Sequence, residues 1–167
     1  MSAVRSSTGI LAENAHEERE RIVEMLTKAY WMEIETVMSY LANSINPDGV
    51  RAQEIIKSLR EDVQEELGHA TQFANRIKEI YGVVPGSMDF QAEQSYLQPP
   101  EHQTDIVHVI KGVIKAETGA IDYYNRIIDA TEESDPVTND MAIAILHDEE
   151  GHRRLFEGFL REYEDQS

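Results

Sequence analysis

The sequence predicts an all-α protein built as a four-helix bundle, and two observations indicate this fold. Four long stretches carry apolar residues three or four positions apart, which is the spacing of a helix with one buried face. No stretch alternates apolar and polar residues with period two, and no Asn-Gly or Asp-Gly turn joins two β-branched runs, so strands are not expected. The length of 167 residues suits one domain with a core of ordinary size.

Turn signals set the expected bounds of each helix. The first helix stops at an Asn-Pro-Asp-Gly turn and the second just before Gly82. Thr104 is the expected N-cap of the third helix, and Asp135 followed by Pro136 is the expected start of the fourth. The helices are predicted over about residues 17–45, 50–81, 104–133 and 135–163. Residues 1–14 are small and Ser-rich and are expected to form a flexible tail before a bundle domain over 15–167.

The connection between the second and third helices, residues 83–103, is much longer than the other two. It holds three prolines and a glycine, so we expect an extended connection and not a fifth long helix. A connection of this length can run along the whole bundle, so the second and third helices can be parallel, whereas short turns make neighbours antiparallel.

Composition limits the partners. The formal charge of −17 repels nucleic-acid phosphates and attracts cations, so no nucleic-acid partner is expected. No apolar run is long enough to span a membrane, and the first ten residues lack the apolar segment of a signal peptide, so a soluble, cytoplasmic protein is expected. Because the chain has no cysteine, disulfides, zinc ribbons and thiol nucleophiles are excluded.

The apolar residues of each predicted helix form a stripe along one face. Each stripe carries one glutamate near its middle, at a position where an ordinary apolar core would have leucine. These residues are Glu33, Glu66, Glu117 and Glu149. Four carboxylates facing one dry interior are costly through desolvation and mutual repulsion, so they must take up protons or bind cations.

Two of these glutamates have a histidine three residues later on the same helix face. The pairs are Glu66 with His69 and Glu149 with His152, and one turn of helix lets each pair hold one metal ion. A third pair, Glu13 with His16, lies at the tail boundary without an apolar stripe, and we give it no role. Two lone core glutamates plus two Glu-x-x-His pairs are the ligand set of ferritin-like di-iron and di-manganese proteins.

With these residues, positions 17–163 resemble the ferritin-like superfamily, in particular bacterioferritins and the bacterioferritin-like Dps group. The likeness is densest in Glu33 to Tyr40, in Glu-Glu-Leu-Gly-His at 65–69, and in Asp-Glu-Glu-Gly-His at 148–152. The resemblance implies a bundle with one long crossover and a site for two irons in each chain. By this resemblance Glu66 and Glu149 bridge the irons, His69 and His152 bind one each, and Glu33 and Glu117 are terminal ligands. Glu65 and Asp148 match carboxylates that orient the ligand imidazoles, and Tyr40 matches a tyrosine near the irons.

Three features of this sequence differ from known groups within the superfamily and limit which of those groups it can resemble. Leu67 stands where bacterioferritins have a haem-ligating methionine, so no haem is expected. Only 15 residues follow His152, so the short fifth helix of 24-subunit cages is not expected. The cysteine pair of thioferritins is missing. The expectation is therefore a Dps-like homo-oligomeric cage of 12 chains.

The function expected from this site is a ferroxidase. It would oxidise Fe(II) with peroxide or dioxygen and store the ferric product, because carboxylates with one imidazole per metal hold both oxidation states. One alternative keeps the ligands but makes the chain a di-metal peroxidase or a manganese catalase without storage. Another is an acidic helical scaffold whose inner glutamates are protonated or paired with arginine. The ligand set accepts manganese as well as iron.

Overall fold

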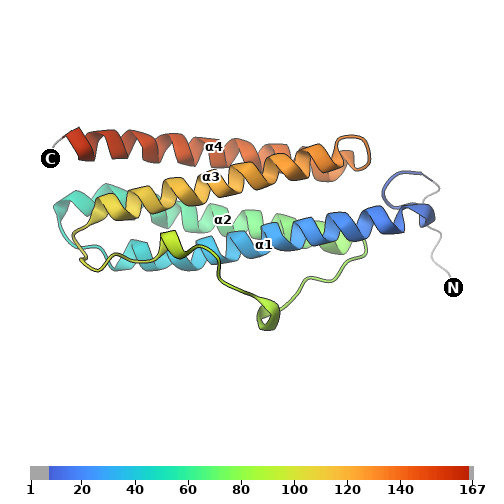
Figure 1. Cartoon of the computed structure of the whole chain (residues 1–167), viewed down its shortest axis with the longest axis horizontal. Coiled ribbons are helices and arrows are strands. Elements are labelled where there is room, and N and C mark those ends of the chain that lie inside the picture. The colour runs from blue at the N-terminus through green and yellow to red at the C-terminus, as the bar shows by residue number, and fades with distance from the viewer. Residues whose placement is uncertain (1–7, 166–167) are drawn as a thin grey trace.

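Four long helices make up most of residues 8–165, the part of the chain that the computed structural model describes. They are α1 (His16–Ile45), α2 (Gln53–Glu79), α3 (Ile106–Thr131) and α4 (Pro136–Asp165), and they lie side by side along the long axis (Figure 1). Residues 8–165 contain no strand and no further helix after α4. The predicted all-α, four-helix fold is confirmed.

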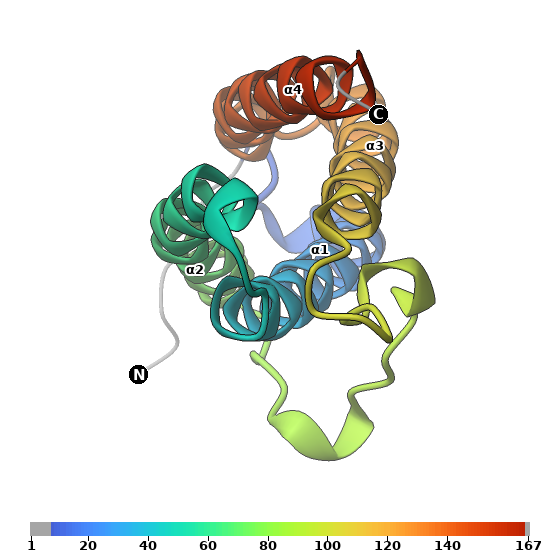
Figure 2. The same cartoon turned by 90° about the vertical axis from the view of Figure 1, so that its left-hand side faces the viewer.

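The connection between α2 and α3 decides the topology of the bundle. It returns along the outside of the bundle, so α3 runs in the same direction as α2, while α1 with α2 and α3 with α4 are antiparallel neighbours (Figure 1). Viewed from one end, the four helices surround a common interior, and the crossover lies outside them near α1 and α3 (Figure 2).

The crossover is attached to α1 through a buried carboxylate. Glu35 is 5% exposed and accepts the backbone N–H groups of Glu93, at 2.9 Å, and Gln94, at 2.7 Å. The crossover contains two short 3-10 turns, η3 (Ser87–Asp89) and η4 (Ser95–Leu97). Where η4 reaches α3, a Cβ on Gly112 would lie only 2.7 Å from the carbonyl oxygen of Tyr96, so this approach requires glycine.

Two details at the helix starts differ from expectation. Asp105, and not Thr104, is the N-cap of α3, because its carboxylate accepts the N–H of His108 at 3.1 Å. Helix α2 begins at Gln53, after a 3-10 turn η2 (Val50–Ala52). Asp135 caps α4 as predicted, with its carboxylate accepting the N–H of Thr138 at 3.1 Å.

The expected tail through residue 14 is partly packed. Ile10 and Ala12 are buried, and the guanidinium of Arg19 donates to both of their carbonyl oxygens, at 2.9 Å for Ile10. A 3-10 turn η1 (Glu13–Ala15) then leads into α1. Apolar burial and a buried arginine therefore fix residues 8–14, whereas residues 1–7 lie outside the described part of the chain.

The apolar core is divided into two clusters at opposite ends of the bundle. One includes Leu59, Ile110 and Phe156, from the start of α2 and α3 and the end of α4. The other includes Leu26 and Phe73, from the start of α1 and the end of α2. The stripe glutamates come from the helix middles and lie between the clusters, so a polar layer interrupts the core. Within residues 8–165, no helix is both long and apolar enough to cross a membrane.

Candidate metal centre

Six side chains predicted to bind metal lie together in this polar layer. Every helix contributes: α1 carries Glu33, α3 carries Glu117, and α2 and α4 carry a Glu-x-x-His pair each. Each of the four glutamates is no more than 2% exposed, His69 is 3% exposed and the side chain of His152 is 11% exposed. The helical period carries the apolar stripe through these positions, so burial of the flanking apolar residues turns the carboxylates inward.

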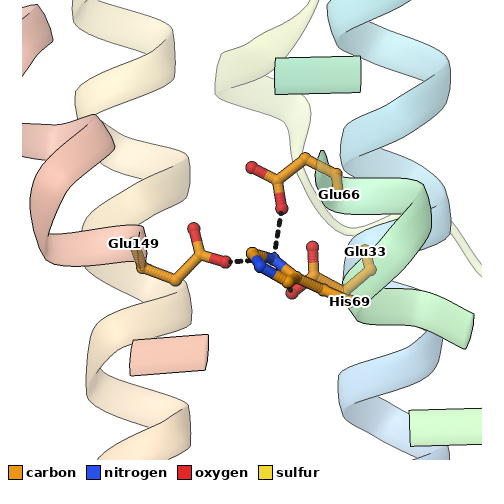
Figure 3. A group of neighbouring side chains, drawn as sticks. All are labelled: Glu33, Glu66, His69 and Glu149. Carbon is orange, nitrogen blue, oxygen red and sulfur yellow. Dashed lines mark hydrogen bonds and ion pairs between the residues drawn. The ribbon is translucent and has the colours of Figure 1, made fainter. Parts of the chain in front are cut away.

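The first half of the centre is gathered around His69. Its Nδ1 lies 2.9 Å from Oε1 of Glu149, 3.1 Å from Oε2 of Glu66 and 3.8 Å from Oε1 of Glu33. Figure 3 shows these side chains converging from three helices.

The second half is gathered around His152 in the same way. Its Nδ1 lies 3.3 Å from Oε1 of Glu66, 3.7 Å from Oε2 of Glu149 and 3.9 Å from Oε1 of Glu117. Glu66 and Glu149 thus belong to both halves, and each turns one oxygen to each half. This is the arrangement that two bridging carboxylates require.

The outer nitrogen of each imidazole faces a carboxylate from the opposite helix. Nε2 of His69 lies 3.1 Å from Oδ2 of Asp148, and Nε2 of His152 lies 2.5 Å from Oε2 of Glu65. With a metal bound, a hydrogen bond donated by Nε2 to this carboxylate would leave the Nδ1 lone pair facing the metal, which is how such carboxylates orient a ligand histidine.

Two tyrosines hydrogen-bond to the lone glutamates. The hydroxyl of Tyr40 donates to Oε1 of Glu117 at 2.5 Å, and that of Tyr124 donates to Oε1 of Glu33. Tyr40 was predicted to lie near the centre, whereas Tyr124 was not singled out. A sequence signal existed, because Tyr124 follows Glu117 by seven residues, just as Tyr40 follows Glu33.

One more acidic residue was missed. Asp62 is 5% exposed, and its Oδ1 lies 3.7 Å from Nε2 of His152. It precedes Glu66 by four residues, so its position on the same helix face was available from the sequence. The remaining pair, Glu13 with His16, is remote from the centre, and the exposed His16 has its Nε2 3.2 Å from Oε1 of Glu20.

Comparison with known proteins identifies the family. Residues 23–165 match the ferritin-like domain family. The chain belongs to this family. A "DNA protection during starvation protein" from Pyrococcus furiosus is 33% identical over 147 residues, which cover 84% of this chain and 77% of the relative.

Solved structures of ferritin-like proteins have the same fold. A dodecameric thioferritin, the bacterioferritin-related protein of Bacteroides fragilis, superposes with a TM-score of 0.82 at 25% identity and covers 89% of each chain. The bacterioferritin of Desulfovibrio desulfuricans has a TM-score of 0.79 at 21% identity, over 92% of this chain and 86% of that one.

Most titratable groups in the polar layer of this ferritin-like chain hold protons more strongly than usual when no cation is bound. Glu149 is the exception, because its contacts with Glu117, His152 and His69 outweigh burial and lower its pKa. Burial and the charges of Glu66 and Glu149 raise the pKa of Glu33 well above its usual value, and burial with its contacts to Glu149 raises that of Glu117. Burial lowers the pKa of His69 and His152, but the neighbouring carboxylates of Glu149 and Glu66 outweigh it and bring these pKa values to about 10 and about 12. Burial likewise raises the pKa of Asp62 to about 7, against the opposing charge of His152.

The donor set fits two divalent cations. Oε1 of Glu66, Oε1 of Glu149 and Nδ1 of His152 are buried without a hydrogen bond of normal geometry, although each has an oppositely charged neighbour. Donor atoms on one ion, at about 2.0–2.2 Å from it, lie about 3–4 Å apart, and the separations around His69 and His152 cover this range. Four carboxylate charges balance two dications, and carboxylate with imidazole is a donor set that iron and manganese accept.

Proposed function

We propose that this ferritin-like chain is a ferroxidase that oxidises Fe(II) with peroxide or dioxygen and stores the ferric product in a homo-oligomeric cage. The observation that carries the proposal is the pair of ligand groups that share Glu66 and Glu149 inside one bundle. Two metal positions with common carboxylates allow two electrons to reach one oxidant together.

In this proposal each chain binds two irons. Glu66 and Glu149 bridge them, His69 and His152 bind one each through Nδ1, and Glu33 and Glu117 complete the two ligand sets. The two Fe(II) supply two electrons, which with two protons reduce one peroxide to two water molecules without releasing hydroxyl radical. Glu65 and Asp148 hold the imidazoles in orientation through Nε2.

The size of the interior supports a small oxidant. The cavity lined by Glu33, Tyr40, Glu66 and their neighbours measures about 10 Å³, close to the volume that one water occupies. A space for about one water-sized molecule favours a small oxidant over an organic substrate.

The test is rapid-mixing measurement of Fe(II) oxidation by the wild type and by Glu66→Ala and Glu149→Ala. We expect both substitutions to abolish the fast phase while the assembly state stays unchanged. Glu150→Ala is the matched control, because Glu150 is the exposed neighbour of Glu149 and should leave the rate unaffected. Unchanged fast oxidation in both core variants would show the assignment to be wrong.

The metal and the storage step need their own measurement. Manganese suits the same donors, so a di-metal peroxidase or manganese catalase without storage is the competing function. Loading with excess Fe(II) should produce electron-dense mineral cores, with iron as the bound metal in elemental analysis of the purified protein. Bound manganese, oxygen release from peroxide and no mineral would favour the competitor.

The proposed assembly is a cage of 12 chains. The Bacteroides fragilis relative is a dodecamer, and α1 carries an exposed apolar stripe of Met38, Leu41 and Ile45, which are 61%, 48% and 65% exposed. Such a stripe at helical spacing favours burial between chains. Native mass spectrometry should give twelve times the 19.0 kDa of one chain.

The proposal also predicts that the protein binds neither DNA nor haem. The Pyrococcus relative is named for DNA protection, yet the charge of −17 opposes direct contact with DNA, so any protection would come from removing Fe(II) and oxidant. A gel shift at low salt should show no tight complex. Leu67 carries no haem ligand, so the purified protein should lack a haem absorption band.

A further inference from the structure

Two cavities meet on the side of the bundle where the crossover lies near α1 and α3 (Figure 2). The outer cavity measures about 370 Å³ and reaches the surface, because exposed side chains of Lys28, Asp122 and Arg126 are part of its lining. The inner cavity is the space of about 10 Å³ next to the candidate centre. Met32 and Gln94 line both cavities. The two cavities therefore share a wall that these two side chains make.

The side chain of Gln94 closes this wall. It is 5% exposed, its Nε2 donates to Oγ1 of Thr36 at 3.0 Å, and the Thr36 hydroxyl lies 3.3 Å from its Oε1. Thr36 itself lines the inner cavity. The backbone of Gln94 is held separately, because Glu35 accepts its N–H at 2.7 Å. Rotation of the Gln94 side chain therefore breaks its contacts with Thr36 and leaves the crossover in place.

The charges around the outer cavity are nearly balanced. The cations of Lys28 and Arg126 share its lining with the carboxylates of Glu35, Glu93 and Asp122, and Nζ of Lys28 lies 3.9 Å from Oε2 of Glu93. A cleft concentrates an ion when charges of one sign line it, so this cavity does not attract Fe(II) strongly. On the α2 and α4 side, by contrast, carboxylates face the outer nitrogens of both ligand histidines. Peroxide and dioxygen are neutral and need no such field.

We propose that the outer cavity is the entrance for the oxidant and that Gln94 is its gate. This inference rests on the proposed function, because it concerns how a neutral oxidant reaches the proposed di-metal centre. The amide of Gln94 and the hydroxyl of Thr36 offer both donors and acceptors, so they can hydrogen-bond peroxide as it passes. Gln94 then controls the entry of the oxidant without controlling the loading of the metal.

Gln94→Ala tests the gate in the full-length protein, because alanine removes the amide and keeps the backbone N–H that Glu35 accepts. Nitric oxide is the probe, since this neutral diatomic binds Fe(II) without turnover. A gate whose open state is populated at about 10% or less slows entry at least about tenfold. Stopped-flow rate constants for nitric oxide binding to the Fe(II)-loaded protein, and for oxidation by dilute peroxide, should rise by about this factor. Co(II) uptake by the metal-free protein should keep its wild-type rate.

Gly119→Leu should have the opposite effect. Gly119 lines the outer cavity, and a Cβ at this position would lie 3.7 Å from the hydroxyl of Tyr96, which is an ordinary contact. A leucine side chain would fill part of the cavity and should slow both nitric oxide binding and oxidation by peroxide. Gln91→Ala is the matched control, because Gln91 is an exposed glutamine of the same crossover. It should leave all three rates as in the wild type.

Wild-type rate constants for nitric oxide and peroxide in either Gln94→Ala or Gly119→Leu would overturn the inference. An equal change in the rate of Co(II) uptake would also overturn it, because Gln94 would then not be specific for the oxidant. A wild-type protein that fails to load two Co(II) per chain, or that binds no nitric oxide after loading with Fe(II), would contradict the proposed function instead. The two failures are therefore distinguishable.

Discussion

Tyr40 on α1 donates a hydrogen bond of 2.5 Å to Glu117 on α3, and a counterpart runs in the opposite direction from Tyr124 on α3 to Glu33 on α1. Each tyrosine follows the lone glutamate of its own helix by seven residues and binds the lone glutamate of the other helix. No short turn joins α1 and α3, which lie next to each other in the bundle (Figure 2). The two bonds therefore connect the halves of the bundle at the level of the candidate centre.

Removing either tyrosine hydroxyl should destabilise the metal-free protein. Tyr40→Phe and Tyr124→Phe each leave a buried carboxyl oxygen without its donor, which costs about 1–3 kcal/mol. Denaturant unfolding of the metal-free protein should show losses of this size and of similar magnitude in both variants. Tyr30→Phe on the half-buried face of α1 is the control and should change little. A loss of stability in only one of the two variants would contradict the idea that the two tyrosine–glutamate hydrogen bonds are equivalent.

Cation binding should release protons. The pKa values of about 10 for His69 and about 12 for His152 mean that both imidazoles are protonated at pH 7 in the metal-free protein. Two divalent cations must displace these protons, because a metal-binding imidazole is neutral. Calorimetric titration with Zn(II) in buffers of different ionisation enthalpy should give about two or more protons released per chain. Binding without proton release would exclude ligation by the two imidazoles.

The same pKa shifts predict how stability depends on pH. Raised pKa values of Glu33, Glu117, His69 and His152 mean that the folded metal-free chain binds more protons than the unfolded chain. Its stability therefore falls as pH rises above about 4.5, first through the glutamates, and it falls further above about 6.5 through the histidines, up to about pH 10 for His69 and about pH 12 for His152. The melting temperature of the metal-free protein should drop from pH 6 to pH 9, while the stabilisation by Zn(II) grows. A pH-independent melting temperature would contradict this prediction.

Glu35 should control the crossover and not the metal centre. Its carboxylate accepts two backbone N–H groups of the crossover, and Glu35→Ala leaves them without partners at a cost of about 1–3 kcal/mol. Hydrogen exchange should become faster in residues 86–98, with Zn(II) stoichiometry unchanged. Glu24→Ala changes an exposed glutamate of the same helix and should leave exchange there as in the wild type.

Arg76 should be one of the strongest stabilising residues outside the core. Its guanidinium donates to Asp135 at 2.8 Å and to Oγ1 of Thr138 at 2.9 Å, which joins the end of α2 to the start of α4. Asp135 is fully buried, so Arg76→Met leaves its charge unpaired and should cost about 3–5 kcal/mol in denaturant unfolding. Arg60→Met, at an exposed position of α2, should be close to neutral.

The helices and the gathering of the six residues were predictable because they depend on local rules. The spacing of three or four along each stripe brings Glu33, Glu66, Glu117 and Glu149 to the inner face, and a histidine one turn later must share it. The packed turn at residues 8–14 was not predictable in this way. It depends on Arg19 donating to two carbonyl oxygens, which no period in the sequence encodes.

By itself, the sequence determined the helical fold, the inward direction of the carboxylates and the donor chemistry of the centre. Only the tertiary structure decided which side chains meet across helices: Tyr124 with Glu33, Glu35 with the crossover, and Asp62 with His152. The physical reason is that helical periodicity fixes the face on which a residue lies. The axial offset and rotation of one helix against another come from the packing of whole side chains, and those two quantities decide every contact between helices.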